Sequence, residues 1–356
     1  MSPETYQVVG LMSGTSLDGL DIALCEFVRG DTWSYRIVEA ETVTYPESIA
    51  SLLRSIDKAD AESLVKAQVH YGSYLGEQVR KFLAERSCSA DFVSSHGHTI
   101  YHQPGNGFTF QLGDGAALSV AAGLPVVSDF RMQDVALGGQ GAPLVPVGDQ
   151  LLFGEFTHCL NLGGIANISF SAGNRRVAGD LCPCNLLLNP VAARRGLPFD
   201  RDGLLAQDGQ PNSELLAELS ALPYYRRSMP KSLGREDLER DYDPILSRFR
   251  LREEDLLATL CEHIATSIAA GIRTPEGSPA SGKLLVTGGG ARNRYLLELI
   301  RKKSPVEVCI PDGSIIDFKE ALIFAFLGLL RWRQEVNVLA SVTGARKDHC
   351  AGSIYL

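Results

Sequence analysis

Residues 10–21, Gly10-Leu-Met-Ser-Gly-Thr-Ser-Leu-Asp-Gly-Leu-Asp21, carry the most information in this sequence. Apolar residues flank them, with Val8 and Val9 before and residues 22–24 after. This pattern predicts a strand, a tight turn and a second strand. Backbone N–H groups and hydroxyls in such a turn can surround a phosphate, while a carboxylate holds a metal. An ordinary polar hairpin fits the stretch equally well, so the rest of the chain has to decide.

Length and composition limit the possibilities. The chain has 356 residues, a formal net charge of −8, 45% hydrophobic and 21% charged residues. This length predicts two domains, and the acidic charge gives no indication of a nucleic-acid surface. The N-terminus lacks the basic and apolar regions of a signal peptide, and the apolar run 321–330 is about half the length that spans a bilayer. We therefore expect a cytoplasmic protein without a membrane partner, in which this run is a buried helix.

The cysteines point the same way. Eight are scattered along the chain, and only Cys182 and Cys184 are close in sequence. Without an export signal, free thiols in a reducing compartment are expected. No C-x-x-C pair is present, which disfavours a structural zinc site.

The pattern of apolar residues predicts an α/β fold in two halves. Each half opens with a strand–turn–strand unit, at residues 7–27 and 157–170. We expect one domain from residues 1–128 together with about 320–356, and a second from residues 129–319. Strands are expected at 7–11, 22–27, 34–45, 91–95, 110–112, 125–127, 157–162, 168–170 and 283–287, and helices at about 46–86, 114–122, 251–272 and 292–300.

Three turns share one design, in which an apolar strand ends in glycines and small polar residues. They are Ser13–Asp21, Asn161–Asn167 and Thr287–Asn293. Glycine allows a close approach of backbone to an anion, and the third turn precedes a helix whose N-terminus also favours one. None matches the P-loop or the G-x-G-x-x-G dinucleotide pattern. One such turn is usually only a turn, but three spread over both halves favour a phosphate site.

Paired turns and a late strand, Gly-rich turn and helix resemble the superfamily of sugar kinases, heat-shock proteins and actin. Within it, the sequence resembles the anhydro-N-acetylmuramic acid kinase family almost from end to end. The resemblance implies two similar ribonuclease-H-like, actin-like ATPase α/β domains with a cleft between them that binds ATP. The matching segments are residues 14–21, 95–99, 129–131, 138–146, 161–167, 230–236, 287–293 and 342–346.

The sequence departs from the family at one turn. The family usually has Asp-Thr-Gly-Pro-Gly-Asn, where this chain has Asp180-Leu-Cys-Pro-Cys-Asn185. The Asp, Pro and Asn are kept, while two glycines have become cysteines. This change could narrow the site or alter its flexibility, and it bears on the exact substrate more than on the reaction class.

The resemblance implies an ATP-dependent kinase of peptidoglycan recycling. Water opens the 1,6-anhydro ring of 1,6-anhydro-N-acetylmuramic acid at C1, and O6 takes the γ-phosphoryl group of ATP to give N-acetylmuramic acid 6-phosphate. Such chemistry needs a base, in-line positioning and neutralisation of phosphate charge. The implied partners are ATP and a small amino sugar, and a homodimer is expected only by family analogy.

The resemblance also assigns roles to residues. Asp180 is implied as the catalytic base, and Asp18 as the ligand of Mg²⁺ near the phosphates. Arg131 is implied to pair with the lactyl carboxylate or a phosphate, with an interdomain salt bridge as the alternative. Glu320 is implied to bind the sugar, or else to act only on a helix dipole. The implied ATP-binding residues are Gly14, Thr15, Ser16, Leu17, Asp18, Gly19, Leu20, Asp21, Asn161, Gly163, Gly164, Asn167, Gly288, Gly289, Gly290 and Asn293; the implied sugar-binding residues are His98, Thr99, Arg131, Asn185 and Glu320.

Three alternatives remain open at this stage. The first is a kinase of another sugar on the same fold, and the second is a nucleotide-dependent binding or assembly module. The third is a metal site on His98 and His102, whose spacing of four would place them on one face of a helix. Gly97 and Pro104 flank that pair and leave room for a short helix at best.

Overall fold

The computed structural model describes residues 4–14, 17, 19–173, 175–272 and 281–356. The chain divides into two compact units: unit 1 is Met1–Leu152 with Phe318–Leu356, and unit 2 is Phe153–Asp317. Residues 129–152 thus belong to unit 1, although we expected them in the second domain. The hydroxyl of Thr343 donates to Asp134 at 2.7 Å, and the Gln140 N–H donates to the Thr343 carbonyl at 2.8 Å. These bonds tie the segment to the C-terminal part of unit 1.

Unit 1 is built on a seven-stranded sheet. Its strands are β1 (Glu4–Ser13), β2 (Leu20–Arg29), β3 (Trp33–Val43), β4 (Phe92–Gln103), β5 (Phe108–Leu112), β6 (Val126–Ser128) and β12 (Ser353–Tyr355). Their order is β12-β6-β4-β1-β2-β3, and β5 pairs with β4. Strands β1, β2 and β3 are antiparallel neighbours, whereas β4 is parallel to both β1 and β6.

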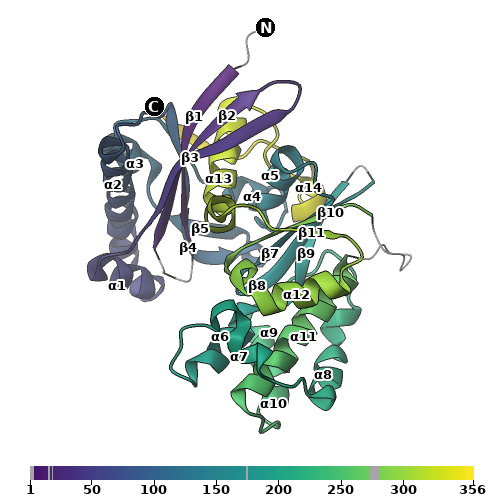
Figure 1. Ribbon diagram of the computed structural model, residues 1–356. Coiled ribbons are helices and arrows are strands. Elements are labelled where there is room, and N and C mark those ends of the chain that lie inside the picture. The colour runs from purple at the N-terminus through teal and green to yellow at the C-terminus, as the bar shows by residue number, and fades with distance from the viewer. Residues whose placement is uncertain (1–3, 15–16, 18, 174, 273–280) are drawn as a thin grey trace. The chain divides into compact units, whose positions relative to one another are not determined.

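Helices cover both faces of this sheet, with α2 and α13 on opposite sides (Figure 1). The helices are α1 (Glu47–Ser55), α2 (Ala61–Glu85), α3 (Gly115–Ala122), α4 (Met132–Ala136), α5 (Val145–Leu152), α13 (Gly313–Trp332) and α14 (Ala340–Thr343). Val9 and Leu11 of β1 join the hydrophobic cluster that contains Tyr71 of α2. On the other face, a Cβ at Gly10 would lie 2.0 Å from the carbonyl oxygen of Ala321, so glycine is what allows α13 to approach β1.

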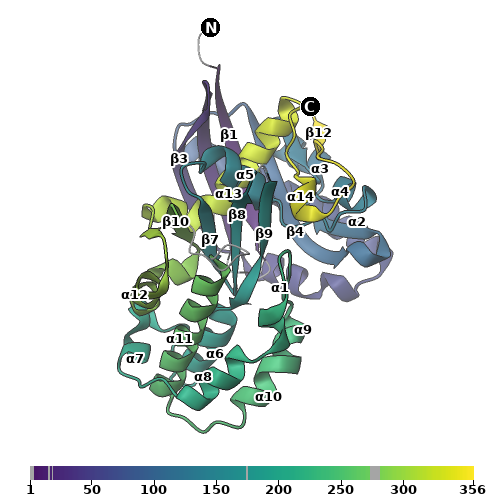
Figure 2. The same ribbon diagram turned by 90° about the vertical axis from the view of Figure 1, so that its right-hand side faces the viewer.

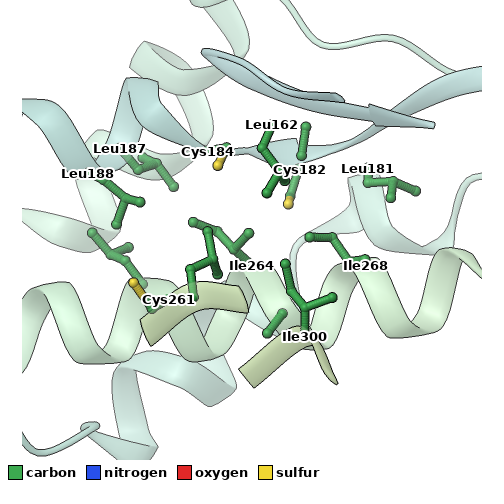
Figure 3. Close-up of a cluster of buried hydrophobic side chains, with 14 of the residues drawn as sticks. Leu162, Leu181, Cys182, Cys184, Leu187, Leu188, Cys261, Ile264, Ile268 and Ile300 are labelled. Atoms are coloured by element: carbon green, nitrogen blue, oxygen red, sulfur yellow. The ribbon is translucent and has the colours of Figure 1, made fainter. Parts of the chain in front are cut away.

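Unit 2 is built on a five-stranded sheet in the order β11-β10-β7-β8-β9. Its strands are β7 (His158–Leu162), β8 (Ile165–Ala172), β9 (Arg175–Pro183), β10 (Lys283–Thr287) and β11 (Glu307–Cys309). Its helices are α6 (Asn185–Ala193), α7 (Leu204–Gln207), α8 (Ser213–Ser220), α9 (Arg235–Asp237), α10 (Asp243–Leu246), α11 (Glu253–Gly271) and α12 (Arg294–Lys303). Helix α11 contacts α6, α7, α8 and α12, and lies among them in Figure 2. Its buried Ile264 and Ile268 pack into the core shown in Figure 3.

The two sheets share one topology. In each, three consecutive strands form an antiparallel ladder, and two further strands add in parallel beside the first: β3-β2-β1-β4-β6 in unit 1 and β9-β8-β7-β10-β11 in unit 2. This is the ribonuclease-H-like order, and its occurrence in both units confirms the expected actin-like α/β fold class.

The expected helix at 46–86 is two helices. Asp60 begins α2, because its carboxylate accepts a hydrogen bond from the Ser63 N–H at 2.8 Å. Val65 and Val69, which we counted on the apolar face, are 65% and 48% exposed. The buried face of α2 therefore lies elsewhere on the helix, which the apolar spacing alone did not show.

The apolar run Ala321–Leu330 is buried within α13, as expected. Because α13 already begins at Gly313, Glu320 lies inside the helix rather than at its start. The alternative role of Glu320 as a partner of the helix N-terminus is therefore wrong. Among the helices of the described residues, none combines the length and apolar character that crossing a membrane requires.

Candidate functional site

Strand β4 is longer than the sequence predicted. We expected a strand ending at Ser95, whereas β4 continues to Gln103 and includes His98 and His102. This pair thus lies on a strand and not on a helix, and His102 Nδ1 lies 3.1 Å from the Thr109 hydroxyl. Within the described parts of the chain, no group of three or more His, Cys, Asp and Glu side chains could hold a metal ion. The metal alternative therefore gains no support.

Gly97 separates two histidines that face opposite sides of the sheet. It has φ 74°, in the left-handed region that favours glycine, and the pairing of β1 with β4 shifts register here. The His96 ring lies 4.6 Å from the ring of Phe324 on α13. The His98 ring lies 6.4 Å from the ring of Tyr71 on α2. The irregularity thus gives two residues that are neighbours on one strand different surroundings.

Arg131 is held by two hydrogen bonds within unit 1. Its Nε donates to His96 Nε2 at 2.9 Å, and its Nη1 donates to the Gly141 carbonyl at 2.7 Å. His96 Nδ1 lies 2.9 Å from the Gly97 carbonyl oxygen, which can only accept, so Nδ1 carries the imidazole proton. Burial and the Arg131 charge hold the pKa of His96 well below its usual value. Arg131 Nη2 has no hydrogen-bond partner among the described residues and is available to an anion.

His98 belongs to a buried hydrogen-bond network. Its Nδ1 lies 2.8 Å from Ser13 Oγ, which accepts hydrogen bonds from the hydroxyls of Tyr45 at 2.7 Å and Tyr71 at 3.0 Å. Burial lowers the pKa of His98 to about 4, so the ring is neutral at physiological pH. Thr99, the next residue, is partly exposed.

The first phosphate turn is described only in part. The Leu17 N–H donates to the Gly14 carbonyl at 3.3 Å, and Leu17 has φ 61°, a strained conformation for a residue with a side chain. A Cβ at Gly19 would lie 2.7 Å from a carbonyl oxygen of β3. Leu20 is fully buried and can offer a ligand only its backbone, while Asp21 accepts a hydrogen bond from β3 at 2.6 Å. The predicted residues Thr15, Ser16 and Asp18 lie outside the described residues.

Glu320 is the acidic group predicted to bind the sugar. Desolvation raises the pKa of its carboxyl, while the charges of Arg131 and Lys319 oppose the rise. Both cations belong to unit 1, as does Glu320. The structure thus gathers His98, Arg131 and Glu320 in the same unit.

Asp180 lies within β9, opposite Asn167 of β8, rather than just past a strand end. Its Oδ2 accepts a hydrogen bond from the Leu233 N–H at 2.9 Å, and its carbonyl accepts one from the Tyr224 hydroxyl at 2.7 Å. In the described residues, the carboxylate has no other hydrogen bond and no ion-pair partner. Burial raises the pKa of Asp180, while the Leu233 N–H lowers it. A partly buried carboxylate with a free oxygen is well suited to accept a proton.

The segment 229–233 passes close to Asp180 because β9 has a glycine there. A Cβ at Gly179 would lie 2.5 Å from Met229 Sδ and 2.9 Å from the Lys231 carbonyl oxygen. The Asp180 N–H donates to that same carbonyl at 2.8 Å. Gly179 thus allows the approach that brings the Leu233 N–H to the carboxylate.

The Gly-rich turn after β10 packs tightly against β7. Gly288 has φ 80°, and a Cβ there would lie 2.4 Å from Asn161 Oδ1. A Cβ at Gly290 would lie 2.7 Å from Leu162 Cβ. Gly289, between them, has nothing within 4 Å of its Cβ position. The predicted ATP-binding residues Asn161, Gly288 and Gly290 are therefore in contact, although more than a hundred residues separate them in sequence.

The turn between β7 and β8 meets the start of α6. The Gly163 carbonyl accepts a hydrogen bond from the Asn185 N–H at 3.2 Å, and the Gly164 carbonyl accepts one from the Cys184 N–H at 2.8 Å. The Asn185 side chain donates to the Leu162 carbonyl at 3.2 Å. Asn185, predicted to bind the sugar, thus lies among residues predicted to bind ATP.

A pocket of about 480 Å³ opens in unit 2 beside these turns. Its size is within the range of small-molecule sites, and its glycines expose backbone to a ligand. Asn293 in its wall also begins α12, because its side chain accepts a hydrogen bond from the Leu296 N–H at 3.0 Å. The lining residues are Asn185, Leu188, Asn189, Phe199, Asp200, Arg201, Asp202, Gly289, Gly290, Arg292 and Asn293.

The two cysteines that replace family glycines point into the core of unit 2. Cys182 and Cys184 are fully buried, and Figure 3 shows both among the leucine and isoleucine side chains of that core. Neither residue has a positive φ, so the backbone does not demand glycine. Their side chains fill core volume instead of narrowing a ligand pocket.

The sequence missed several residues of these sites. In unit 1 it missed Ser13, although this residue lies within the opening stretch, and it missed Tyr45, Tyr71 and His96. No spacing pattern links the two tyrosines to His98, because the contact depends on the fold. In unit 2 it missed most of the pocket wall, for which the charged turn at residues 198–203 is the only sequence signal.

Comparisons with known proteins agree with the resemblance. Residues 6–356 match the family model described as anhydro-N-acetylmuramic acid kinase. Proteins of that name from Sulfurimonas denitrificans and Saccharophagus degradans are 35% and 34% identical, over 98% and 100% of both chains. One from Methylobacterium nodulans is 37% identical over 97% of this chain and 98% of the relative. Among solved structures, the chain aligns with an activator of 2-hydroxyisocaproyl-CoA dehydratase from Clostridium difficile at 13% identity and a TM-score of 0.41, over 93% of this chain and 98% of that one, which is too distant to inform the site.

The duplicated sheet topology and the Gly-lined pocket define a protein of the actin-like ATPase class. Within that class, the chain belongs to the anhydro-N-acetylmuramic acid kinase family.

Proposed function

We propose that this protein is an ATP-dependent kinase of 1,6-anhydro-N-acetylmuramic acid in peptidoglycan recycling. Water adds to C1, the C1–O6 bond breaks, and O6 takes the γ-phosphoryl group of ATP, which leaves as ADP. The observation that carries the proposal is the family match over residues 6–356, with relatives that align over nearly the whole of both chains. We further propose that the enzyme acts in the cytoplasm; a homodimer stays a prediction.

We assign the base to Asp180. Its Oδ2 is engaged by the Leu233 N–H, which leaves Oδ1 to take the proton of the attacking water. Burial raises the pKa of Asp180 and so makes it a stronger base than an exposed aspartate. A positioned base of this kind contributes about 10²- to 10⁴-fold to a rate.

We assign the recognition of the sugar to groups of unit 1. The His96 and Gly141 contacts fix the plane of the Arg131 guanidinium, and its Nη2 is then directed at an anion such as the lactyl carboxylate. His98, Thr99 and Glu320 are the polar partners proposed for the rest of the sugar.

We assign the nucleotide to the pocket of unit 2. Gly289, Gly290 and Asn293 in its wall fit a nucleoside whose phosphates reach the glycine-rich turns. ATP, when bound, supplies the γ-phosphoryl group. Asn185 lines the same pocket, so its proposed role moves from the sugar to the nucleotide. Magnesium stays a prediction, since its expected ligand Asp18 lies outside the described residues.

Turnover in H₂¹⁸O tests the proposal. We expect ¹⁸O at C1 of the phosphorylated product, because the hydroxyl at C1 comes from water. A kinase of another sugar that simply phosphorylates a hydroxyl would leave C1 unlabelled, and this result would overturn the proposal. A nucleotide-dependent assembly module would release ADP at a rate that the anhydro sugar does not change.

A further inference from the structure

The hydroxyl of Ser13 decides which nitrogen of His98 carries the proton. A hydroxyl has one proton to donate and two lone pairs with which to accept. Ser13 Oγ accepts from Tyr45 at 2.7 Å and from Tyr71 at 3.0 Å, so both lone pairs are occupied. Its contact with His98 Nδ1 at 2.8 Å is then one in which Ser13 donates. Nδ1 of His98 is thus a bare acceptor, and the proton of the neutral ring is on Nε2.

The network holds this arrangement at neutral pH. Ser13, Tyr71 and Tyr45 are 2%, 0% and 7% exposed, so water cannot easily supply other partners. Burial raises the pKa of Tyr45, and it raises that of Tyr71 well above its ordinary value, so both tyrosines keep their protons. The tyrosines therefore remain donors, and Ser13 has only its own proton to give to His98.

The two histidines of β4 consequently differ in their available nitrogen. His96 has its proton on Nδ1 and uses Nε2 to accept from Arg131. His98 has its proton on Nε2, for which no hydrogen-bond partner is found among the described residues. His98 is 4% exposed, yet its Nε2 is not one of the fully buried polar atoms without a partner. The small accessible surface therefore includes Nε2, which presents an N–H outward.

We propose that Tyr45 and Tyr71, acting through Ser13, position His98 as a dedicated hydrogen-bond donor to an oxygen of the sugar. This inference rests on the proposed function and deepens it, because it specifies what His98 recognises. A carbonyl, ether or hydroxyl oxygen of the substrate fits such a donor. A substrate group that has only N–H to offer does not.

The tautomer is measurable without any substrate. In the sugar-free protein labelled with ¹⁵N histidine, we expect His98 Nε2 to show the chemical shift of a protonated nitrogen and Nδ1 that of an unprotonated one. His96 serves as the internal control, with the opposite assignment. Tyr45→Phe removes one donor to Ser13 and frees a lone pair, so proton density should move to Nδ1 of His98. A wild-type His98 protonated on Nδ1 would overturn the inference, whatever the enzyme's activity.

Two substitutions at His98 then test recognition. His98→Gln keeps an N–H near the position of Nε2, whereas His98→Asn keeps only a partner for Ser13. We expect His98→Asn to raise the KM for 1,6-anhydro-N-acetylmuramic acid about tenfold, as the loss of one hydrogen bond predicts, and His98→Gln to recover most of it. The KM for ATP should not change in either variant, and the exposed His70→Asn serves as the matched control.

The outcomes separate this inference from the proposed function. If the wild type turns over the anhydro sugar but His98→Gln is as impaired as His98→Asn, the donor role is wrong and the function stands. If the wild type does not turn over the sugar, the proposed function fails, and with it the assignment of the sugar as the partner of His98. Binding of the sugar that shifts the Nε2 resonance, together with rescue by His98→Gln, supports both.

Discussion

The two units use the same strand order but treat the fourth strand of that order differently. In unit 1, β4 runs on past its pairing with β1, bends at Gly97 and returns as β5. In unit 2, β10 stops at Thr287 and passes through three glycines towards α12. The first arrangement presents imidazole groups, and the second presents bare backbone beside a pocket.

This difference shows how one scaffold provides two kinds of binding chemistry. Imidazole and guanidinium groups, fixed by hydrogen bonds, suit the directional recognition of a polar ligand such as a sugar. Glycines that leave N–H groups accessible suit phosphates and a nucleoside. We therefore expect substitutions in unit 1 to act on the sugar, and those at the glycines of unit 2 to act on the nucleotide.

The largest effect should come from Asp180, the one residue of unit 2 that we assign to chemistry. Asp180→Asn should lower kcat about a thousandfold, because the amide cannot take the proton of water, with little change in ATP binding. Since burial raises the pKa of Asp180, the wild-type kcat/KM should fall on acidification at a pH above that of an ordinary aspartate, as the base becomes protonated. Steady-state rates across pH measure both, with the exposed Asp31→Asn as control. A variant that keeps more than half of the activity would place the base elsewhere.

The next largest effect tests the glycines of unit 2. A Cβ at Gly290 would lie 2.7 Å from Leu162 Cβ, so Gly290→Ala should weaken ATP binding tenfold or more and lower the free energy of unfolding by about 1–3 kcal/mol. Gly289→Ala has nothing within 4 Å and should leave stability unchanged. Titration calorimetry and chemical denaturation measure the two effects. If Gly290→Ala changed only the KM for the sugar, the division of labour between the units would be wrong.

Arg131 tests unit 1 in the same way. Arg131→Lys loses the planar group that His96 and Gly141 hold, so the KM for the sugar should rise about tenfold while the KM for ATP stays constant. Arg36→Lys, in an exposed pair with Glu26, is the matched control. A rise in the KM for ATP alone would show that Arg131 serves a phosphate.

The smallest effect on catalysis should come from the cysteines. Cys182→Gly restores the family residue but removes a buried side chain and adds backbone freedom, so the free energy of unfolding should fall by about 1–3 kcal/mol. Kinetic constants for the sugar should not change, because the side chain points into the core. Cys309→Ser, at a partly exposed position, provides the comparison in denaturation experiments. A changed sugar KM without loss of stability would mean that Cys182 shapes the site after all.

Much of the fold was predictable because its signals are local. Apolar runs between Gly-rich turns located β1, β2, β7 and β10, and the apolar run 321–330 located the buried part of α13. The failures arose where tertiary contacts override local pattern. Strand β4 extends through polar residues because β5 pairs with it, and residues 129–152 join unit 1 because Thr343 and Asp134 hydrogen-bond across 209 positions.

The candidate site was predictable to a lesser degree. The sequence located the three turns and Asp180, since glycines and carboxylates at strand ends carry their chemistry in their identity. It could not show that Asn185 lies with the nucleotide residues, nor that the two substituted cysteines face the core. Both depend on which way a side chain points, which a single sequence does not reveal.

By itself, the sequence determined the two-part α/β plan, the family and the identity of the reactive groups, because these are written in residue types and their spacing. Only the tertiary structure decided the states of those groups. Gly97 directs His96 and His98 to opposite faces of one sheet, and their different neighbours give them opposite tautomers. A protonation state depends on the hydrogen-bond partners within about 3 Å, and the chain assembles those partners from distant positions only when it folds.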